Sequence, residues 1–323
     1  MRAIRAGVAG GPEVLEWVEV PDPLPGPGEL LVRLHAAGVN FIDTYQRGGI
    51  YPMPFPHVPG SEGSGVVVSG TDGFSPGDRV AWAQAPGSYA ELVVVPAARA
   101  LRVPDTVELD TAAALPLQGL TAHYLLRSTF PVGEGTTMLI TGGAGGVGHL
   151  AIQIAKALGA TVLATVGTAA KTGPALEAGA DHVLVLDRMS DVVADLPAAV
   201  RTLVPGGVDV SYDGVGRDTF DATLACIRPR GLQVLFGGAS GQVPPFDLQR
   251  LNAAGSLFVT RPTLAHHLAT REELDWRAGE LFGMLDAGTL HVEIGLRAPL
   301  SAARAAHEAL EARATTGKVI LVA

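Results

Sequence analysis

TMLITGGAGGVGHLAIQ, residues 137–153 of this 323-residue chain, reads as an apolar strand, glycines at the spacing GxGxxG and an amphipathic helix. In such a unit Gly143 permits a tight turn, Gly145 lets the backbone approach a pyrophosphate, and Gly148 lets the helix pack closely against the strand. The free backbone amides at the start of the helix then face the phosphate oxygens. The stretch therefore predicts a dinucleotide phosphate site on a Rossmann-type unit.

The end of the next predicted strand, residues 161–166, indicates which dinucleotide binds. A site for NAD has an acidic residue about 20 positions after the glycines, where it holds the ribose hydroxyls. Here the strand runs into Gly167, Thr168 and Lys171, with no acidic residue. A hydroxyl and an ammonium group suit a ribose 2′-phosphate, which a carboxylate would repel. We therefore expect NADPH, with the alternative that Lys171 is an ordinary surface charge.

Composition limits the classes of protein to consider. With 47% hydrophobic residues the chain can bury a large core, and its length favours two domains. A net charge of −9 and the absence of a basic run argue against a nucleic-acid partner. The one cysteine, Cys226, excludes an intramolecular disulfide and a cysteine-built zinc site. We find no signal peptide and no membrane-spanning run, so we expect a soluble, cytoplasmic protein.

Two kinds of pattern follow one another along the chain. Residues 1–118 carry short β-type runs between proline- and glycine-rich turns, which predicts an antiparallel, partly open barrel. In residues 119–257 strands alternate with helices, which predicts a parallel, doubly wound sheet. The tail, residues 258–323, ends in an apolar strand that we expect to return to the first domain. The predicted fold class is α/β, with a barrel domain of residues 1–118 and 258–323 and an inserted Rossmann domain of residues 119–257.

The chain resembles the medium-chain dehydrogenase/reductase superfamily over essentially its whole length. Within that superfamily it is similar to the zinc-independent, zeta-crystallin-like quinone oxidoreductases, whose barrel domain is of the GroES-like type. The segments that carry the resemblance, besides the glycine turn, are GVNFIDTY (38–45), GIYP (49–52), PGSEGSG (59–65), QGLTA (118–122), YDGVGRD (212–218) and GSLFVTRP (255–262).

The resemblance also shows which metal ligands are missing. Zinc alcohol dehydrogenases hold their catalytic zinc with a cysteine, a histidine and a second cysteine, and those positions are Asn40, Ser61 and Leu117 here. None of the three supplies a thiolate or an imidazole, whereas a catalytic zinc needs three protein ligands. We therefore expect no metal, and an acceptor that is already electron-poor, such as a quinone or an α,β-unsaturated carbonyl.

Reduction without a metal requires positioning and stabilisation of charge. The acceptor must lie roughly 3 to 3.5 Å from the nicotinamide, with hydrogen bonds to the developing oxyanion. Asn40, Tyr45 and Tyr51 are the candidate catalytic residues, and the alternative for the two tyrosines is that they are ordinary half-buried aromatics. The resemblance implies that Asn40 and Tyr45 also border the nicotinamide.

The resemblance implies further contacts to NADPH, and two departures from the family pattern bear on them. Leu186 stands where relatives have a tyrosine that encloses the adenosine end, and Gly214 replaces a serine. Both changes weaken the expected recognition of the 2′-phosphate. The implied cofactor-binding residues are Gln118, Thr121 and Tyr124 near the nicotinamide and its ribose, Gly146 and Val147 at the pyrophosphate, Gly167, Thr168 and Lys171 at the 2′-phosphate, Phe236, Gly237, Gly238, Ala239, Val259, Thr260 and Arg261 along the nicotinamide edge, and Arg313 from the tail.

Three functions are open at this point. The first is an NADPH:quinone oxidoreductase that works by hydride or one-electron transfer. The second is an NADPH-dependent reductase of enones, 2-alkenals or enoyl thioesters, and the third is a non-catalytic NADPH-binding protein. Residues 255–260 form an apolar β-type run at the end of the predicted parallel sheet, where an unpaired edge invites pairing with another chain. Because related proteins pair that edge across a two-fold axis, we expect a homodimer.

Overall fold

The computed structural model describes residues 1–323 and divides into two compact units. Unit 1 consists of Met1–Leu120 and Leu268–Ala323, and unit 2 consists of Thr121–His267. The second boundary therefore falls after His267 rather than after residue 257, where the sequence pattern suggested it. The reason is that β13 (Phe258–Thr260) pairs in parallel with β12 (Ile227–Leu235), so this strand completes the sheet of unit 2.

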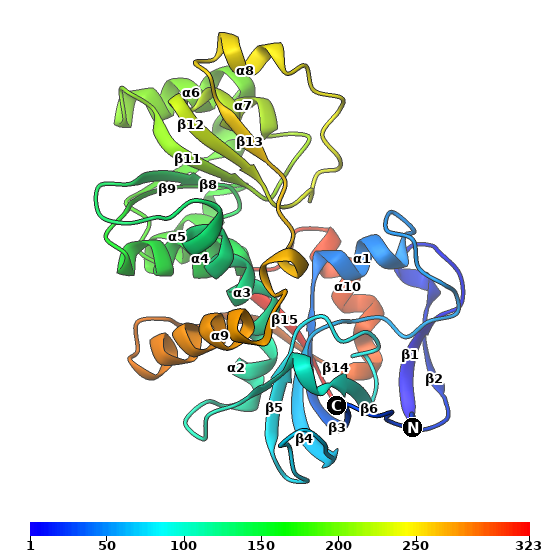
Figure 1. The fold of residues 1–323 in the computed structure, drawn as a ribbon. Helices are drawn as coiled ribbons and strands as arrows, with labels where there is room; N and C mark the ends of the chain where they lie inside the picture. The colour runs from blue at the N-terminus through cyan, green and yellow to red at the C-terminus, as the bar shows by residue number, and fades with distance from the viewer. The chain divides into compact units, whose positions relative to one another are not determined.

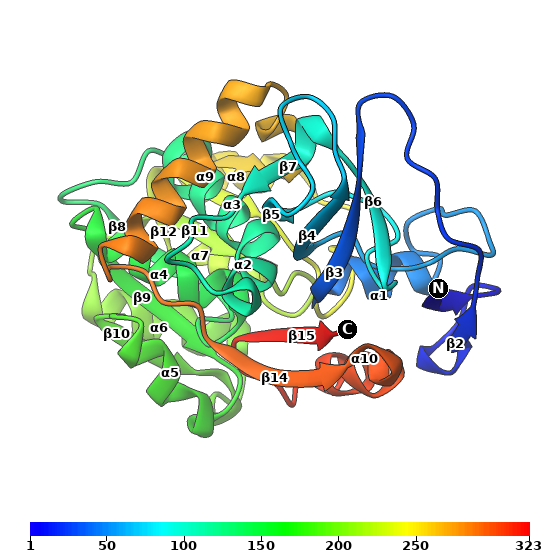
Figure 2. The same cartoon turned by 90° about the horizontal axis from the view of Figure 1, so that it is seen from below.

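Unit 1 is built on a seven-stranded sheet with the order β14-β15-β3-β4-β5-β7, in which β6 also pairs with β3 (Figure 2). The C-terminal strand β15 lies antiparallel to β3, which confirms that the tail returns to the N-terminal barrel. A separate antiparallel hairpin joins β1 and β2. The strands are β1 (Arg2–Ala6), β2 (Leu15–Glu19), β3 (Glu29–Val39), β4 (Gly63–Ser69), β5 (Arg79–Trp82), β6 (Leu92–Pro96), β7 (Ala100–Arg102), β14 (Ile294–Pro299) and β15 (Lys318–Val322).

Buried and more exposed side chains alternate along β3, the strand that pairs with β15, β4 and β6. Leu30, Val32 and Leu34 are buried at every second position and pack in one apolar cluster with Trp82. Side chains alternate between the two faces of a strand, so this spacing turns one whole face inward. The helices of this part of the chain are α1 (Phe41–Arg47), α2 (Leu109–Ala114), α3 (Pro116–Tyr124), α9 (Arg271–Asp286) and α10 (Ala303–Glu311).

Unit 2 contains a six-stranded parallel sheet with the order β10-β9-β8-β11-β12-β13. This is the doubly wound Rossmann order, in which the chain reverses direction across the sheet between β8 and β11. Dinucleotides bind outside the carboxyl ends of the strands at such a reversal point. The strands not yet given are β8 (Thr137–Ile140), β9 (Thr161–Val166), β10 (His182–Val185) and β11 (Val208–Asp213).

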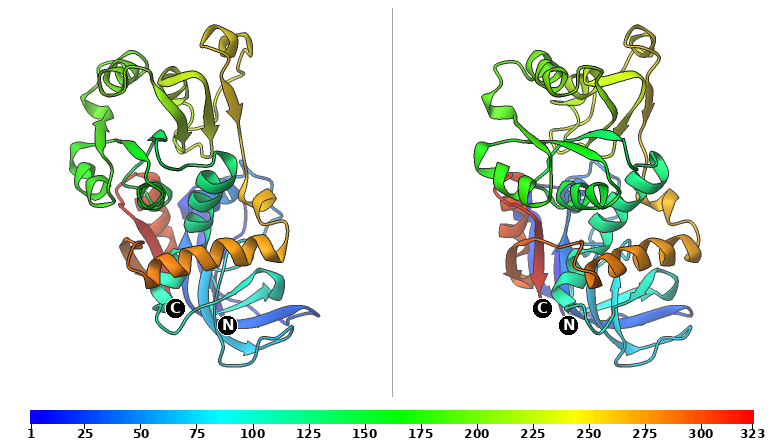
Figure 3. Two further views of the ribbon diagram at one scale, coloured as in Figure 1. Left: turned by 60° about the vertical axis from the view of Figure 1, so that its left-hand side comes forward. Right: turned by 90° about the vertical axis from the view of Figure 1, so that its left-hand side faces the viewer.

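Helices cover both faces of this sheet, as the predicted alternation requires. Figure 1 shows α4 and α5 on one side of the strands and α6 and α7 on the other, and Figure 3 shows the same layers from two further directions. Cys226 is fully buried in the core, and burial raises the pKa of its thiol to about 12. No helix is both long and apolar enough to cross a membrane. The helices are α4 (Gly146–Ala157), α5 (Thr172–Glu177), α6 (Val192–Leu203), α7 (Phe220–Ala225) and α8 (Gln249–Ala253).

Candidate active site and cofactor site

The glycine turn joins β8 to α4 at the carboxyl edge of the sheet. The residue with positive φ is Gly142, at +68°, so the tight turn that we expected at Gly143 is made one position earlier. A Cβ atom on Gly143 would lie 2.8 Å from that of Ala164, so Gly143 permits close packing instead. A Cβ atom on Gly148 would overlap the carbonyl oxygen of Gly142, as expected from its place in the spacing. The absence of side chains brings the first turn of α4 against the strand.

The start of α4 fits a pyrophosphate. Gly145 is the N-cap residue, and its own amide bonds to the carbonyl of Gly142 at 2.8 Å. Gly146 and Val147 follow in the first turn and are partly exposed. The first amides of a helix have no partner within it, and the helix dipole favours a negative charge there. The cradle formed by these glycines is therefore chemically suited to the phosphate groups of a dinucleotide.

The residues expected at the 2′-phosphate follow β9. Gly167 and Thr168 are exposed, and Lys171 ends a short 3-10 turn, Ala169–Lys171. The amide of Asp187 bonds to the carbonyl of Gly167 at 3.0 Å, which places the turn after β10 beside this loop. The sequence did not predict that this turn lies beside Gly167, because its position depends on the pairing of β10 with β9 and not on a motif.

Leu186 and Arg188 belong to the same turn after β10, Leu186–Arg188. The Leu186 side chain packs against the apolar core of unit 2 and is partly buried. It therefore replaces the tyrosine of relatives with a core contact, not with a polar group. Arg188 is exposed, as is Asp187, so the turn presents one charge of each sign to solvent.

A buried carboxylate ties together the two strands at the reversal point of the sheet. Asp213, at the end of β11, is fully buried. Its Oδ1 accepts hydrogen bonds from the Thr141 hydroxyl at 3.1 Å and the Thr219 hydroxyl at 2.8 Å, so it links the end of β8 to the start of α7. The same oxygen accepts the backbone N–H groups of Val215 at 2.9 Å and Gly216 at 3.2 Å. Asp213 thus shapes the loop at the carboxyl edge of the sheet, a role that the motif YDGVGRD alone did not reveal.

Of the residues expected along the nicotinamide edge, Phe236 to Ala239 lie in the loop after β12, and Val259, Thr260 and Arg261 lie on or directly after β13. The Phe236 amide bonds to the Asp213 carbonyl at 2.8 Å, and the Ala239 amide bonds to the Gly214 carbonyl at 3.2 Å. A Cβ atom on Gly214 would lie 2.6 Å from the Phe236 ring, so this ring fills the space next to the position of the family serine. The Arg261 guanidinium donates to the Phe236 carbonyl at 3.1 Å. The structure therefore brings Arg261 to the loop that contains Phe236, Gly237 and Gly238, at the carboxyl edge of the sheet.

The residues expected near the nicotinamide ribose lie along α3. Gln118, Thr121 and Tyr124 are three positions apart, which places them along one side of the helix. Tyr124 is buried, and its ring stacks on that of His267 with 4.3 Å between centroids. Burial raises the pKa of the Tyr124 hydroxyl to about 12. The stacking gives His267, the last residue of unit 2, a defined packing contact.

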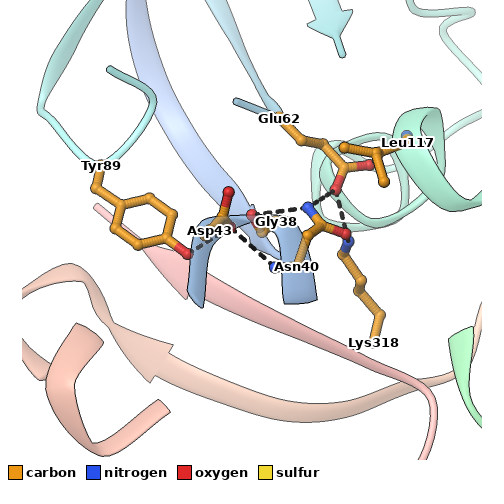
Figure 4. A network of polar contacts seen from close by, with 7 residues as sticks. All are labelled: Gly38, Asn40, Asp43, Glu62, Tyr89, Leu117 and Lys318. Carbon is orange, nitrogen blue, oxygen red and sulfur yellow. Dashed lines mark hydrogen bonds and ion pairs between the residues drawn. The ribbon is translucent and has the colours of Figure 1, made fainter. Parts of the chain in front are cut away.

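Asn40 lies in a buried polar network of unit 1 (Figure 4). The Lys318 ammonium donates to Asn40 Oδ1 at 2.6 Å and to Glu62 Oε2 at 2.5 Å. The Asn40 amide nitrogen donates to Glu62 Oε2 at 2.8 Å and to the Gly38 carbonyl at 3.3 Å. The Leu117 amide donates to Glu62 Oε1 at 2.6 Å. Both N–H groups of the Asn40 side chain are therefore engaged by the protein, with no donor left over for an oxyanion in this arrangement.

A second branch of buried polar groups starts at Asp43. The Tyr89 hydroxyl donates to Asp43 Oδ2 at 2.9 Å and lies 3.1 Å from His307 Nε2. Arg47 lies 2.9 Å from His307 Nδ1 and 2.6 Å from a Glu311 oxygen. Arginine only donates, so Nδ1 is the acceptor and the proton of His307 sits on Nε2, which donates to Tyr89. Burial lowers the pKa of His307 to about 3.

Asp43 also holds the start of α1, the helix that carries Tyr45. Its Oδ2 accepts the Asn40 backbone amide at 2.9 Å, which secures the first turn of the helix. Burial raises the pKa of Asp43 to about 7, although the bonds from Asn40 and Tyr89 oppose that change. The other oxygen, Oδ1, has no hydrogen-bond partner. A charge on this carboxyl is therefore only half satisfied.

Tyr45 and Tyr51 form an aromatic pair. Their rings meet edge to face with 5.7 Å between centroids, and Phe41 lies 6.3 Å from Tyr45. Tyr51 is 39% exposed. Arg313 follows α10 with a φ of +55° and is exposed. No group of three or more His, Cys, Asp or Glu side chains in residues 1–323 is arranged to hold a metal ion.

Comparison with known proteins places this geometry in a family. The alcohol dehydrogenase GroES-like domain matches residues 26–105, and the zinc-binding dehydrogenase domain matches residues 146–276. A quinone oxidoreductase of Pseudomonas aeruginosa is 44% identical over 99% of both chains. A 2-haloacrylate reductase of a Burkholderia species is 40% identical over 97% of this chain and 96% of the relative. A mycobacterial protein solved in complex with NADPH is 49% identical over 100% of both chains, with a TM-score of 0.97.

Proposed function

The chain belongs to the zeta-crystallin-like quinone oxidoreductases of the medium-chain dehydrogenase/reductase superfamily, and on that premise we propose that it reduces quinones with NADPH. The observation that carries the proposal is the pairing of an intact dinucleotide cradle with Asn40, Ser61 and Leu117 at the metal-ligand positions. NADPH, when bound, supplies the hydride. A quinone is electron-poor enough to accept a hydride without a Lewis acid, because its ring disperses the charge.

The chain's own residues have three tasks in this reaction. The amides at Gly146 and Val147 bind the pyrophosphate, and Thr168 and Lys171 bind the 2′-phosphate. The aromatic pair of Tyr45 and Tyr51 packs against the acceptor ring, and the hydroxyl of the partly exposed Tyr51 donates to its developing oxyanion. Both N–H groups of Asn40 are already engaged, so this amide shapes the site and the tyrosines supply the donors.

The test is NADPH oxidation against a panel of quinones, enones and 2-alkenals. We expect turnover with quinones, and turnover with the other acceptors would extend the function to the second candidate. That candidate is favoured by the relative named as a 2-haloacrylate reductase, because its substrate carries a conjugated carbon–carbon double bond. Saturable NADPH binding without turnover of any acceptor would leave only the non-catalytic binding protein.

Lys171→Ala should weaken NADPH binding on the order of tenfold and leave NADH binding unchanged. The physical reason is that only NADPH carries the 2′-phosphate that an ammonium group can bind by a charge-assisted hydrogen bond. The expected loss is small because Leu186 faces the core and Asp187 adds a carboxylate to the neighbouring turn. Dissociation constants from the quenching of protein fluorescence measure both cofactors.

Arg304→Ala is the control for this prediction. Arg304 is an exposed cation that pairs with Glu308 on α10 and is not among the residues assigned to the cofactor. Its loss changes the net charge equally and should affect neither cofactor. If Lys171→Ala weakens NADPH and NADH by the same factor, Lys171 is an ordinary surface residue and the assignment of the 2′-phosphate site is wrong.

The protein is expected to be a homodimer that pairs through β13. This strand is the last in the sheet of unit 2, and Phe258 and Val259 on it are 63% and 38% exposed. They line a surface cavity of about 540 Å³ together with Phe130, Arg230 and Leu232. An exposed apolar edge strand is a template for pairing with a second copy. Light scattering should give twice the chain mass, and Phe258→Glu should shift it to the monomer. A monomer mass for the unaltered protein at micromolar concentration contradicts this proposal.

We also propose that the protein is cytoplasmic. This location is supported by the assignment of NADPH as cofactor and by a single cysteine that is buried and free. Fractionation of cells that express the protein tests it.

A further inference from the structure

We propose that the buried Lys318–Glu62 pair holds the acceptor side of this site together in the place where related dehydrogenases use a metal ion, and that Lys318 fixes the orientation of the Asn40 amide. The proposal rests on the proposed function, because it assigns a positioning role within that reaction. Lys318 and Glu62 lie 256 residues apart in the sequence, so no spacing connects them.

The Glu62 carboxylate connects all the segments that carry the metal-ligand positions of zinc dehydrogenases. Glu62 itself follows Ser61, the second of these positions. Its Oε2 accepts the Asn40 amide at the first position, and its Oε1 accepts the Leu117 backbone amide at the third. Lys318 then joins this cluster to β15. A metal ion would connect these segments through its ligands, and here a carboxylate and an ammonium group do so.

The two charges leave the Asn40 amide only one orientation. Its oxygen accepts from the Lys318 ammonium, and its nitrogen donates to the Glu62 carboxylate. Rotation of the amide by half a turn would direct N–H groups at a cation and a carbonyl oxygen at an anion. Both charge-assisted hydrogen bonds of the Asn40 amide would then become repulsions. Lys318 therefore fixes the oxygen of this amide, and Glu62 fixes its nitrogen.

Burial makes this constraint strong. Glu62, Lys318 and Asn40 are 0%, 1% and 4% exposed. Charges so far from water attract each other strongly and leave a large penalty when one of them is unpaired. The chain also makes room for the pair, because a Cβ atom on Gly38 would overlap the Glu62 carboxylate and lie 2.9 Å from the Ala113 carbonyl.

The orientation of Asn40 matters because this residue begins α1. Its backbone amide bonds to Asp43, and the helix that follows carries Tyr45. A displaced Asn40 therefore moves the start of the helix that presents the aromatic pair to the acceptor. Lys318 acts through Asn40 and has no contact with the acceptor in this scheme, so it is a positioning residue.

The test uses a paired substitution, since either single change would leave a buried charge without its partner. Glu62→Gln with Lys318→Met removes both charges, keeps the approximate volumes and retains an acceptor for the Leu117 amide. We expect a folded protein with nearly unchanged NADPH affinity and a kcat for quinones reduced on the order of 10- to 100-fold. The control is Lys156→Met with Asp181→Asn, which removes a partly exposed Lys–Asp pair from unit 2 and should leave kcat unchanged.

A double-mutant cycle shows whether the pair acts through Asn40. Asn40→Ala alone should lower kcat by a similar factor, and adding it to the paired variant should lower kcat no further. A kcat of the paired variant within about twofold of the unaltered enzyme, or losses that multiply in the triple variant, would overturn the proposal.

A readout that needs no turnover separates this inference from the proposed function. The side-chain amide protons of Asn40, assigned in NMR spectra by their loss in Asn40→Ala, should exchange slowly in the unaltered protein and much faster in the paired variant. If no acceptor is reduced, the proposed function fails while this comparison still decides the role of the pair. Equal exchange in both proteins contradicts it.

Discussion

Gly148→Ala is expected to lower the affinity for NADPH about 100-fold, because the first turn of α4 can no longer approach the strand. A Cβ atom at this position would overlap the Gly142 carbonyl oxygen and lie 3.0 Å from Gly143 Cα. All of these neighbours are backbone atoms, so no side chain can rotate away. The helix must shift, and its amides then miss the pyrophosphate. Isothermal titration with NADPH measures the loss.

Gly173→Ala is the matched control for Gly148→Ala. Gly173 also lies near the start of a helix, α5, but no atom lies within 4 Å of its added Cβ atom. Alanine favours helices over glycine by up to about 1 kcal/mol, so this variant should be as stable as the unaltered protein or slightly more so. Unchanged NADPH affinity in Gly148→Ala would mean that close packing of this turn is not required for binding.

Asp43→Asn and His307→Gln are expected to change the pH dependence of stability in opposite directions. Between about pH 4 and 7 the folded protein keeps a proton on Asp43 that the unfolded chain has lost, because burial raises the pKa of this carboxyl to about 7. Asp43 therefore makes the free energy of unfolding fall as the pH rises through this window. Each proton corresponds to a slope of about 1.4 kcal/mol per pH unit.

His307 has the opposite effect. Between about pH 3 and 6.5 the unfolded chain binds a proton on this histidine, whereas the folded protein, with a pKa of about 3, does not. His307 therefore makes the free energy of unfolding rise with pH through that window. From about pH 4 to 6.5 both states hold the same number of protons on the two groups, so their contributions cancel.

Each substitution removes one of the cancelling contributions. Relative to the unaltered protein, Asp43→Asn should gain about 1.4 kcal/mol of stability per pH unit from pH 4 to 6.5, and His307→Gln should lose about as much. Over that range the two variants diverge by about 7 kcal/mol. Urea denaturation at a series of pH values measures the differences. Profiles of both variants parallel to that of the unaltered protein would show that Asp43 and His307 titrate normally in the fold.

The glycine turn shows what the sequence could predict. The strand, the GxGxxG spacing and the helix are local features, so they predicted both the dinucleotide site and the parallel sheet around it. The prediction that Gly143 makes the tight turn was wrong. The residue with positive φ is Gly142, because this depends on the path of the turn and not on the spacing of the glycines. The short β-type runs of residues 1–118 predicted the barrel, the apolar C-terminal strand predicted the return of β15 to it, and both are confirmed.

The buried networks of unit 1 could not be predicted in the same way. Lys318 lies 278 residues from Asn40, and His307 lies 218 residues from Tyr89, so no spacing in the sequence connects them. One signal was present: Lys318 is one of three lysines in the chain and opens an apolar strand, KVILV. A cation at the start of a buried strand requires a partner, and the search for that partner leads to Glu62.

NADPH oxidation by protein treated with a strong chelator shows whether the reduction of quinones here needs a metal. Elemental analysis of the same sample gives its zinc content. We expect undiminished turnover of quinones with far less than one zinc per chain, because Asn40, Ser61 and Leu117 offer no thiolate or imidazole ligand. Stoichiometric zinc before chelation, together with loss of turnover afterwards, would contradict it.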